Sequence, residues 1–181
     1  MVNTERLVIQ PLTFSQLKKY ILADGSLEEE LKTKHIPRVI SAELKDALEH
    51  TIFPAMESGY QNYLYSTLWT IITKDCNHII GDLCFIGEPN YEGEIEIGYG
   101  TYERFQGKGY MKEAISGMIA WAAEQDKVKS IIAHTLKSNQ ASYMLLIKNN
   151  FRQIDEMEFL YKWEIRLKDQ VSKETWLRPT S

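Results

Sequence analysis

The sequence has few cysteines and no long apolar segment. Cys76 and Cys84 lack the spacing of metal ligands and form no disulfide framework, which is typical of a protein in a reducing compartment. The most apolar stretch, residues 115–123, is too short to span a bilayer. The N-terminus lacks the basic segment and apolar core of a signal peptide. We therefore expect a cytoplasmic protein with no membrane association and no metal site.

The sequence also lacks a basic excess. Its net charge is -4 and its pI is about 5.6, which argues against a nucleic-acid partner. With 181 residues, 44% of them hydrophobic, the chain is long enough to bury a core. No internal repeat or linker divides it. We expect one domain over residues 1–181, with residues 168–181 as a loosely held polar tail, and a monomer or homodimer.

Hydrophobic periodicity and residue composition predict one strand, up to three helices, three strands, and then the order helix, strand, helix, strand, strand. The segments with β-branched and aromatic enrichment are residues 5–10, 66–74, 78–86, 93–99, 130–135, 151–157 and 159–167. The segments with helical spacing or capping signals are residues 13–24, 26–32, 41–59, 111–125 and 139–150. Pro54 is expected to end or bend the third of these helices. The order predicts an α/β (α+β) domain with a mixed sheet of about seven strands.

The segment RFQGKGYMKEA, residues 104–114, lies between a predicted strand and a long predicted helix. A helix N-terminus exposes unpaired N–H groups and favours negative charge, and glycines allow an anion to approach the main chain. The segment is not a dinucleotide fingerprint, because position 112 is lysine instead of a third glycine. It also lacks the spacing and the Lys-Ser/Thr pair of a P-loop. It therefore indicates another kind of anion site.

Residues 96–114 (EIGYGTYERFQGKGYMKEA) and 139–151 (NQASYMLLIKNNF), in this order of elements, resemble the GNAT superfamily of N-acetyltransferases over nearly the whole chain. The opening TERLVIQPLT resembles in particular the branch that acetylates ribosomal-protein N-termini. The resemblance implies a mostly antiparallel central sheet with helices on both faces. It also implies a splay after the fourth predicted strand and acetyl-coenzyme A (acetyl-CoA) as cosubstrate.

The family motif Gln/Arg-x-x-Gly-x-Gly/Ala matches Gln106, Gly109 and Met111, although the family prefers glycine or alanine at the last position. In the family, backbone amides of this motif bind the pyrophosphate and the preceding strand bonds the pantetheine arm. Gly98 and Gly100, on that strand, are compatible with a β-bulge. By resemblance, the cofactor-binding residues are Ile97, Tyr99, Thr101, Gln106, Gly107, Lys108, Gly109, Tyr110, Met111, Asn139 and Ser142.

The second motif departs from the family at position 146, where many members carry a tyrosine that protonates the leaving thiolate and this chain has leucine. By resemblance to the ribosomal-protein branch, Ser142, one helical turn earlier, is the candidate donor. Tyr143 is the alternative. Both residues also have local interpretations, a hydrogen bond within the helix for Ser142 and core packing for Tyr143.

Direct acetyl transfer also needs a general base for the amine. Glu94 and Glu96 share one face of the predicted strand, and Glu96 lies nearer the implied splay. Glu96 is therefore the candidate base. The alternative is that Glu94 and Glu96 only form a polar row that faces solvent. His134, on the next strand, is a candidate proton relay or a structural histidine.

Three functions follow from the sequence. The first is an acetyl-CoA-dependent N-acetyltransferase acting on a protein or peptide N-terminal amine, as the nearest branch implies. The second is the same transfer to a small amine such as a polyamine or an aminoglycoside. The third is a CoA-binding domain without catalysis, suggested by Leu146 in place of the tyrosine.

Overall fold

The computed structural model describes residues 1–58 and 62–167, so the tail predicted at residues 168–181 lies outside the described part. Within it, one sheet has the strand order β1-β2-β3-β4-β5-β6-β8-β7. The strands are β1 (Val2–Asn3), β2 (Leu7–Pro11), β3 (Leu68–Thr73), β4 (Ile79–Phe85), β5 (Glu94–Thr101), β6 (Ser130–Leu136), β7 (Arg152–Glu156) and β8 (Leu160–Arg166). The α-helices are α1 (Phe14–Leu22), α2 (Ser26–Leu31), α3 (Ala42–Ala47), α4 (Phe53–Ser58), α5 (Tyr110–Ala123) and α6 (Gln140–Lys148).

The sheet is mixed and mostly antiparallel, as predicted. Only β5 and β6 are parallel neighbours among its adjacent strands. The eighth strand is the short β1, whose two residues pair with Val8 and Ile9. A strand of two residues is too short to show hydrophobic periodicity. The sequence therefore predicted about seven strands and missed β1.

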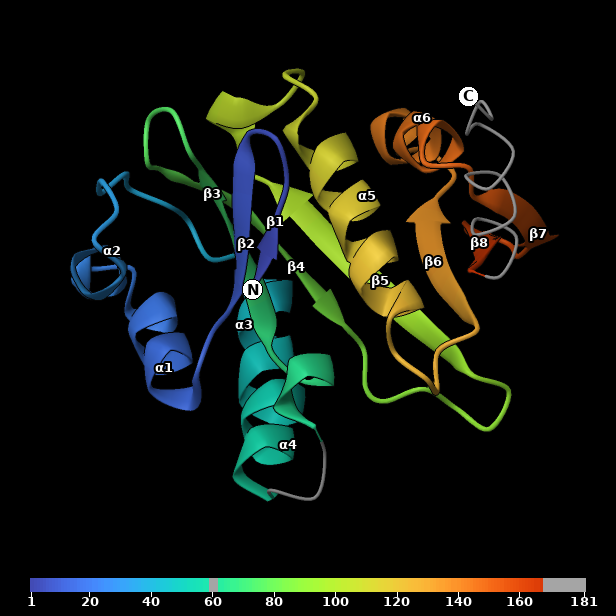
Figure 1. The fold of residues 1–181 in the computed structure, drawn as a ribbon, viewed down its shortest axis with the longest axis horizontal. Helices are drawn as coiled ribbons and strands as arrows, with labels where there is room; N and C mark the ends of the chain where they lie inside the picture. The colour runs from blue at the N-terminus through green and yellow to red at the C-terminus, as the bar shows by residue number, and fades with distance from the viewer. Residues whose placement is uncertain (59–61, 168–181) are drawn as a thin grey trace, which may run out of the picture.

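Helices cover both faces of the sheet, and each face has its own core. On one face, Trp69 and Ile71 of β3 pack in a cluster with Met118 of α5, and Figure 1 shows α5 crossing this face. On the other face, Leu68 of β3 packs in a second cluster with Leu17 of α1. Side chains on β3 alternate between the two clusters, as the period of a strand requires.

β5 and β6 diverge and open the sheet on one side. Residues Glu94 to Glu96 pair with β6, whereas β5 continues to Thr101 with β4 as its partner. Figure 1 shows the two strands side by side at their starts and apart at their ends. The predicted splay after the fourth predicted strand, now β5, is confirmed. It leaves backbone groups on the β6 side of Ile97–Thr101 available to a ligand.

One local prediction, the bulge in β5, was wrong, and of the two outcomes predicted for Pro54 one does not occur. The β4–β5 pairing keeps one register from Gly81↔Thr101 to Phe85↔Ile97, so β5 has no bulge there. An added Cβ at Gly98 would lie 3.5 Å from the Cys84 sulfur, an ordinary van der Waals contact. Pro54 does not end its helix, because the chain turns through a π-helical segment at Leu48–Ile52 and continues as α4. A π turn shifts the hydrogen-bond register, which accommodates a proline without an N–H.

None of the described helices combines the length and apolarity that crossing a membrane requires.

A buried carboxylate on β4 connects that strand with α1 and with the residue that follows β5. Asp82 of β4 accepts hydrogen bonds from the hydroxyls of Tyr20 on α1, at 2.6 Å, and Tyr102, at 3.0 Å, just after β5. Its other oxygen, Oδ1, has no hydrogen-bond partner among the described residues. Burial, the largest effect, outweighs the two tyrosine hydrogen bonds and the nearby Arg38 charge, and raises the pKa of Asp82 from 3.8 to about 6.

Asp82 is therefore expected to make the protein less stable as pH rises. The carboxyl group is protonated in both states below its unfolded pKa, and its ionisation in the fold costs stability as pH rises through about 6. Asp82→Asn removes this cost, so between pH 4 and pH 7.5 the variant is expected to gain about 2 kcal/mol over the wild type. Urea unfolding at the two pH values measures the difference. An equal difference at both would contradict the assigned pKa.

Candidate active site

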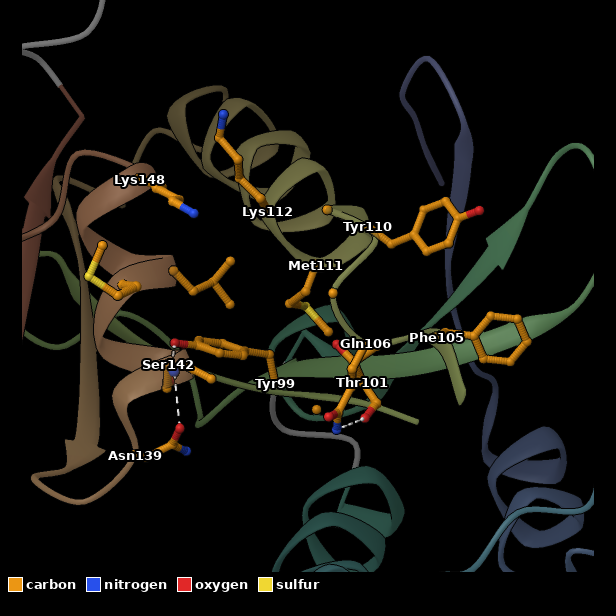
Figure 2. A pocket seen from close by; sticks show the side chains of 16 residues that line it. Tyr99, Thr101, Phe105, Gln106, Tyr110, Met111, Lys112, Asn139, Ser142 and Lys148 are labelled. Carbon is orange, nitrogen blue, oxygen red and sulfur yellow. Dashed lines mark hydrogen bonds between the residues drawn. The ribbon is translucent and has the colours of Figure 1, made fainter. Parts of the chain in front are cut away.

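A pocket of about 680 Å³ lies between β5, the loop that follows it, α5 and α6. Of the eleven residues predicted to bind the cofactor, nine line it, and Ile97 and Lys108 do not. Ile97 is buried in the core beneath α5, and the Lys108 side chain lies over the Phe105 ring. The fold thus brings the two sequence motifs together, and Figure 2 shows them on opposite walls of the pocket.

The floor of the pocket is the loop that leads into α5. Gly107 and Gly109 have φ of 73° and 78°, and Gly109 is the N-cap residue of the helix. These are left-handed conformations that other residues adopt at a cost. The first N–H groups of α5 have no helical carbonyl to bond, and both the helix dipole and the donors favour an anion. The predicted cradle for a pyrophosphate therefore fits the observed backbone.

Gln106 connects this loop to the end of β5 by a hydrogen bond. Its side-chain amide donates a hydrogen bond of 3.2 Å to the carbonyl oxygen of Thr101, the last residue of β5 (Figure 2). Gln106 thus joins the end of the splayed strand to the start of the glycine loop. This contact gives the motif's glutamine a structural task beside any contact with the ligand.

Two lysines at the pocket were not predicted from sequence. Lys112 of α5 and Lys148 of α6 line it and stand at one end in Figure 2, with Asn139 at the other. Their positive charge would suit the phosphates of a CoA molecule. Lys148 shares a face of α6 with other missed lining residues, Ala141, Met144 and Leu145. Projecting the predicted helix at three- and four-residue spacing from position 141 would have found this face.

Asn139 and Ser142 form the start of α6. The Asn139 side-chain oxygen accepts a hydrogen bond of 3.0 Å from the Ser142 N–H and caps the helix. The Ser142 hydroxyl is 2.7 Å from the hydroxyl of Tyr99 on β5, within hydrogen-bond distance. Burial raises the pKa of Tyr99 more than the Ser142 contact lowers it, so the phenol keeps its proton at neutral pH. The two hydroxyls form a proton-carrying pair inside the pocket.

The other candidate donor, Tyr143, lies outside the pocket. Tyr143 packs edge-on against Trp163, with ring centroids 4.9 Å apart, and does not line the pocket. Leu146, which stands where the family's tyrosine would be, is fully buried. Ser142 is therefore the better-placed of the two donors predicted from sequence, and its role stays a prediction.

Glu96 and His134 meet on the other face of the sheet. The Oε1 atom of Glu96 is 2.8 Å from Nδ1 of His134, and their side chains are 35% and 26% exposed. Ile95 and Ile97, the neighbours of Glu96 on β5, point into the core beneath α5, so Glu96 points away from it. The pair is beside the last residues shared by β5 and β6, where the strands part. A candidate base and its histidine partner thus lie across the sheet from the pocket.

The family model of the acetyltransferase (GNAT) domain matches residues 6–152, most of the chain. The protein belongs to the GNAT acetyltransferase family. The GNAT fold binds acetyl-CoA as cosubstrate, and the glycine loop, the helix N-terminus and the two pocket lysines fit its phosphates.

A segment of 83 residues is 37% identical to the uncharacterized N-acetyltransferase YjdG of Bacillus subtilis (strain 168). It covers 46% of this chain and 49% of that protein, so the match spans about half the length of this curated relative.

Solved structures share the fold at lower identity. RimL, a ribosomal-protein α-N-acetyltransferase, in complex with CoA, aligns with a TM-score of 0.65 and 18% identity over 90% of this chain and 95% of that chain. The dodecameric spermidine N-acetyltransferase from Vibrio cholerae aligns with a TM-score of 0.64 and 15% identity over 94% and 99%. At these identities the likeness shows the fold alone.

Proposed function

We propose that this protein transfers the acetyl group of acetyl-CoA directly to the N-terminal amine of a protein or peptide. The observation that carries the proposal is the Glu96–His134 pair on the sheet face away from the CoA pocket, at the splay and open to solvent. An amine on a long chain can reach an exposed pair of this kind, whereas small ligands are usually held in enclosed pockets. The structural likeness to RimL agrees with this choice.

Glu96 serves as the general base. It takes a proton from the attacking ammonium, directly or through a water, and the hydrogen bond to His134 orients its carboxylate. The unpaired backbone donors of β5 beyond Glu96 lie where they can polarise the thioester carbonyl. Acetyl-CoA supplies an activated acyl group, and holding it beside the amine contributes much of the rate.

Ser142 serves as the general acid. As the bond between the carbonyl carbon and sulfur breaks and the carbon–nitrogen bond forms, Ser142 gives a proton to the thiolate and regains one from Tyr99. The amide nitrogen releases its second proton to solvent, and Tyr99 is reprotonated from solvent. Tyr99 comes from β5 and thus places a phenol in the pocket although position 146 is leucine. The exchange leaves the amide product and the CoA thiol.

A small polyamine is the second candidate acceptor, because a spermidine N-acetyltransferase shares the fold and Glu94 adds a second carboxylate beside Glu96 on β5. The two acceptors differ in basicity. An N-terminal amine has a pKa near 8, so roughly a tenth of it is unprotonated at pH 7, compared with well under about 1% of an alkylamine with a pKa near 10. The larger unprotonated fraction of the N-terminal amine makes it the readier nucleophile.

A panel of acceptors tests the proposal. Peptides with a free N-terminus, the same peptides blocked at the N-terminus but carrying lysine, spermidine and an aminoglycoside are each incubated with acetyl-CoA. We expect kcat/KM for the free N-termini to exceed that of every other amine by about tenfold or more, from their larger unprotonated fraction. CoA release measures the rate, and mass spectrometry locates the acetyl group.

The outcomes separate the three functions. Faster acetylation of spermidine or the aminoglycoside would assign a small-molecule acceptor. CoA binding without acetylation of any amine would favour a CoA-binding domain that does not catalyse transfer.

A further inference from the structure

The N-terminal hairpin, formed by β1, β2 and the turn between them, contacts the glycine loop through Arg6 of that turn. The Arg6 Nε atom donates to Oε2 of Glu113 at 2.6 Å, and the Arg6 backbone N–H donates to Oε1 of the same carboxylate at 2.7 Å. Thr4 donates its hydroxyl to Oε1 at 2.6 Å. Arg6 Nη1 donates at 3.2 Å to the carbonyl oxygen of Lys108, inside the loop. The hairpin is thereby joined to both the loop and the first turn of α5 (Figure 1).

This contact is more than an ordinary surface ion pair. An exposed pair with a single contact contributes little, but here one carboxylate receives three hydrogen bonds and is only 17% exposed. Burial would raise the pKa of Glu113, and the hydrogen bonds from Thr4 and Arg6 outweigh it and lower that pKa. The Arg6 guanidinium also lies 4.7 Å from the centroid of the Tyr110 ring. Its position is therefore fixed from several sides.

The bond to the Lys108 carbonyl sets the direction of the next N–H group. In a trans peptide the C=O and N–H point in opposite directions, and every described peptide bond is trans. Since Arg6 holds the Lys108 oxygen, the N–H of Gly109 points away from Arg6. Arg6 lines a second hollow beside α5, whereas Gly109 borders both that hollow and the CoA pocket. The Gly109 N–H is thus directed to the pocket side.

Arg6 also balances the charge of Glu113. A carboxylate in the first turn of α5 favours the helix dipole but repels a phosphate bound to the same turn. The guanidinium neutralises this carboxylate while leaving the helix N–H groups free. Both effects of Arg6 favour an anion at the loop.

We propose that Arg6 is a positioning residue for the pyrophosphate of acetyl-CoA, acting through the Lys108 carbonyl and Glu113 and not by direct contact with the reacting atoms. The proposal rests on the proposed use of acetyl-CoA. It assigns a task to the TERL segment, which lies about a hundred residues before the glycine loop in the sequence.

Binding of CoA and of pantetheine, which lacks the phosphates, tests the proposal. Arg6→Met is expected to raise the Kd for CoA about tenfold, the usual scale for losing one charge-assisted contact, and to leave the Kd for pantetheine unchanged. Arg6→Lys keeps the charge but cannot contact Glu113 and the Lys108 carbonyl at the same time as a guanidinium does. Its Kd for CoA is therefore expected to lie between those of the wild type and Arg6→Met. Arg166→Met, which removes another exposed arginine paired with a glutamate, is the matched control and is expected to bind like the wild type.

Calorimetry for CoA and ligand-observed NMR for pantetheine supply the constants. Equal loss of both ligands in Arg6→Met would show a general structural defect and overturn the proposal, as would unchanged CoA binding. A wild-type protein that binds no CoA would overturn the proposed function itself, together with this inference.

Discussion

Replacing Gly109 by valine is expected to raise the Kd for CoA about 100-fold, from backbone strain and blocked access together. Gly109 has φ of 78°, a conformation that is costly for a β-branched residue. An added Cβ would also lie 3.6 Å from an Arg6 nitrogen, so larger atoms would disturb the contact that orients the loop. Calorimetric titration with CoA measures the change.

Gly87→Val is the matched control. Gly87 has a φ of 84° and no heavy atom within 4 Å of an added Cβ, and it lies in the turn between β4 and β5 outside the CoA pocket. It therefore carries the backbone strain of the Gly109 variant without the loss of an anion site. If both variants bind CoA equally well, the glycine loop is not the phosphate cradle.

Ser142→Ala is expected to lower kcat about 100-fold, the scale of a lost general acid, while the Kd for CoA changes by less than about threefold. The hydroxyl is deleted, but the Ser142 backbone N–H that Asn139 caps is kept, so α6 is expected to start unchanged. Tyr99→Phe, which removes the partner hydroxyl at 2.7 Å, is expected to lower kcat by a smaller factor. Steady-state rates and CoA titration of each variant give the comparison.

Ser116→Ala on the exposed side of α5 is the control for the serine substitution and is expected to leave kcat unchanged. A Ser142→Ala variant that loses binding and turnover to the same extent would show that Ser142 positions the cofactor and does not donate the proton.

Local patterns were sufficient to predict much of the fold. The β-branched and aromatic enrichment in residues 66–74 corresponds to β3, which is buried throughout. The four-residue spacing in residues 111–125 corresponds to α5, because helical periodicity reports which side of a helix is buried. The glycine loop was also visible, since Gly107 and Gly109 stand where a left-handed backbone is needed. The splay came from family resemblance, because divergence of two strands has no periodicity of its own.

The contacts that complete the site were not predictable from local sequence. Arg6 and Glu113 are 107 positions apart, and Tyr99 and Ser142 are 43 apart. Such pairs are created by the crossing of strands and helices, and only three-dimensional packing brings them to hydrogen-bond distance. Tyr143 illustrates the converse, because it was an alternative proton donor in the sequence analysis while its ring packs with Trp163.

The crystal structure of the complex with CoA tests the central claim most directly. The account predicts the pyrophosphate on the backbone amides of residues 107–111, the pantetheine arm along β5 beyond Glu96, and the sulfur within about 4 Å of the Ser142 hydroxyl, the reach of a proton donor. The Glu96–His134 pair would then face the thioester position from the opposite side of the splay. A CoA molecule bound outside this pocket, or a sulfur remote from both Ser142 and Glu96, would contradict it.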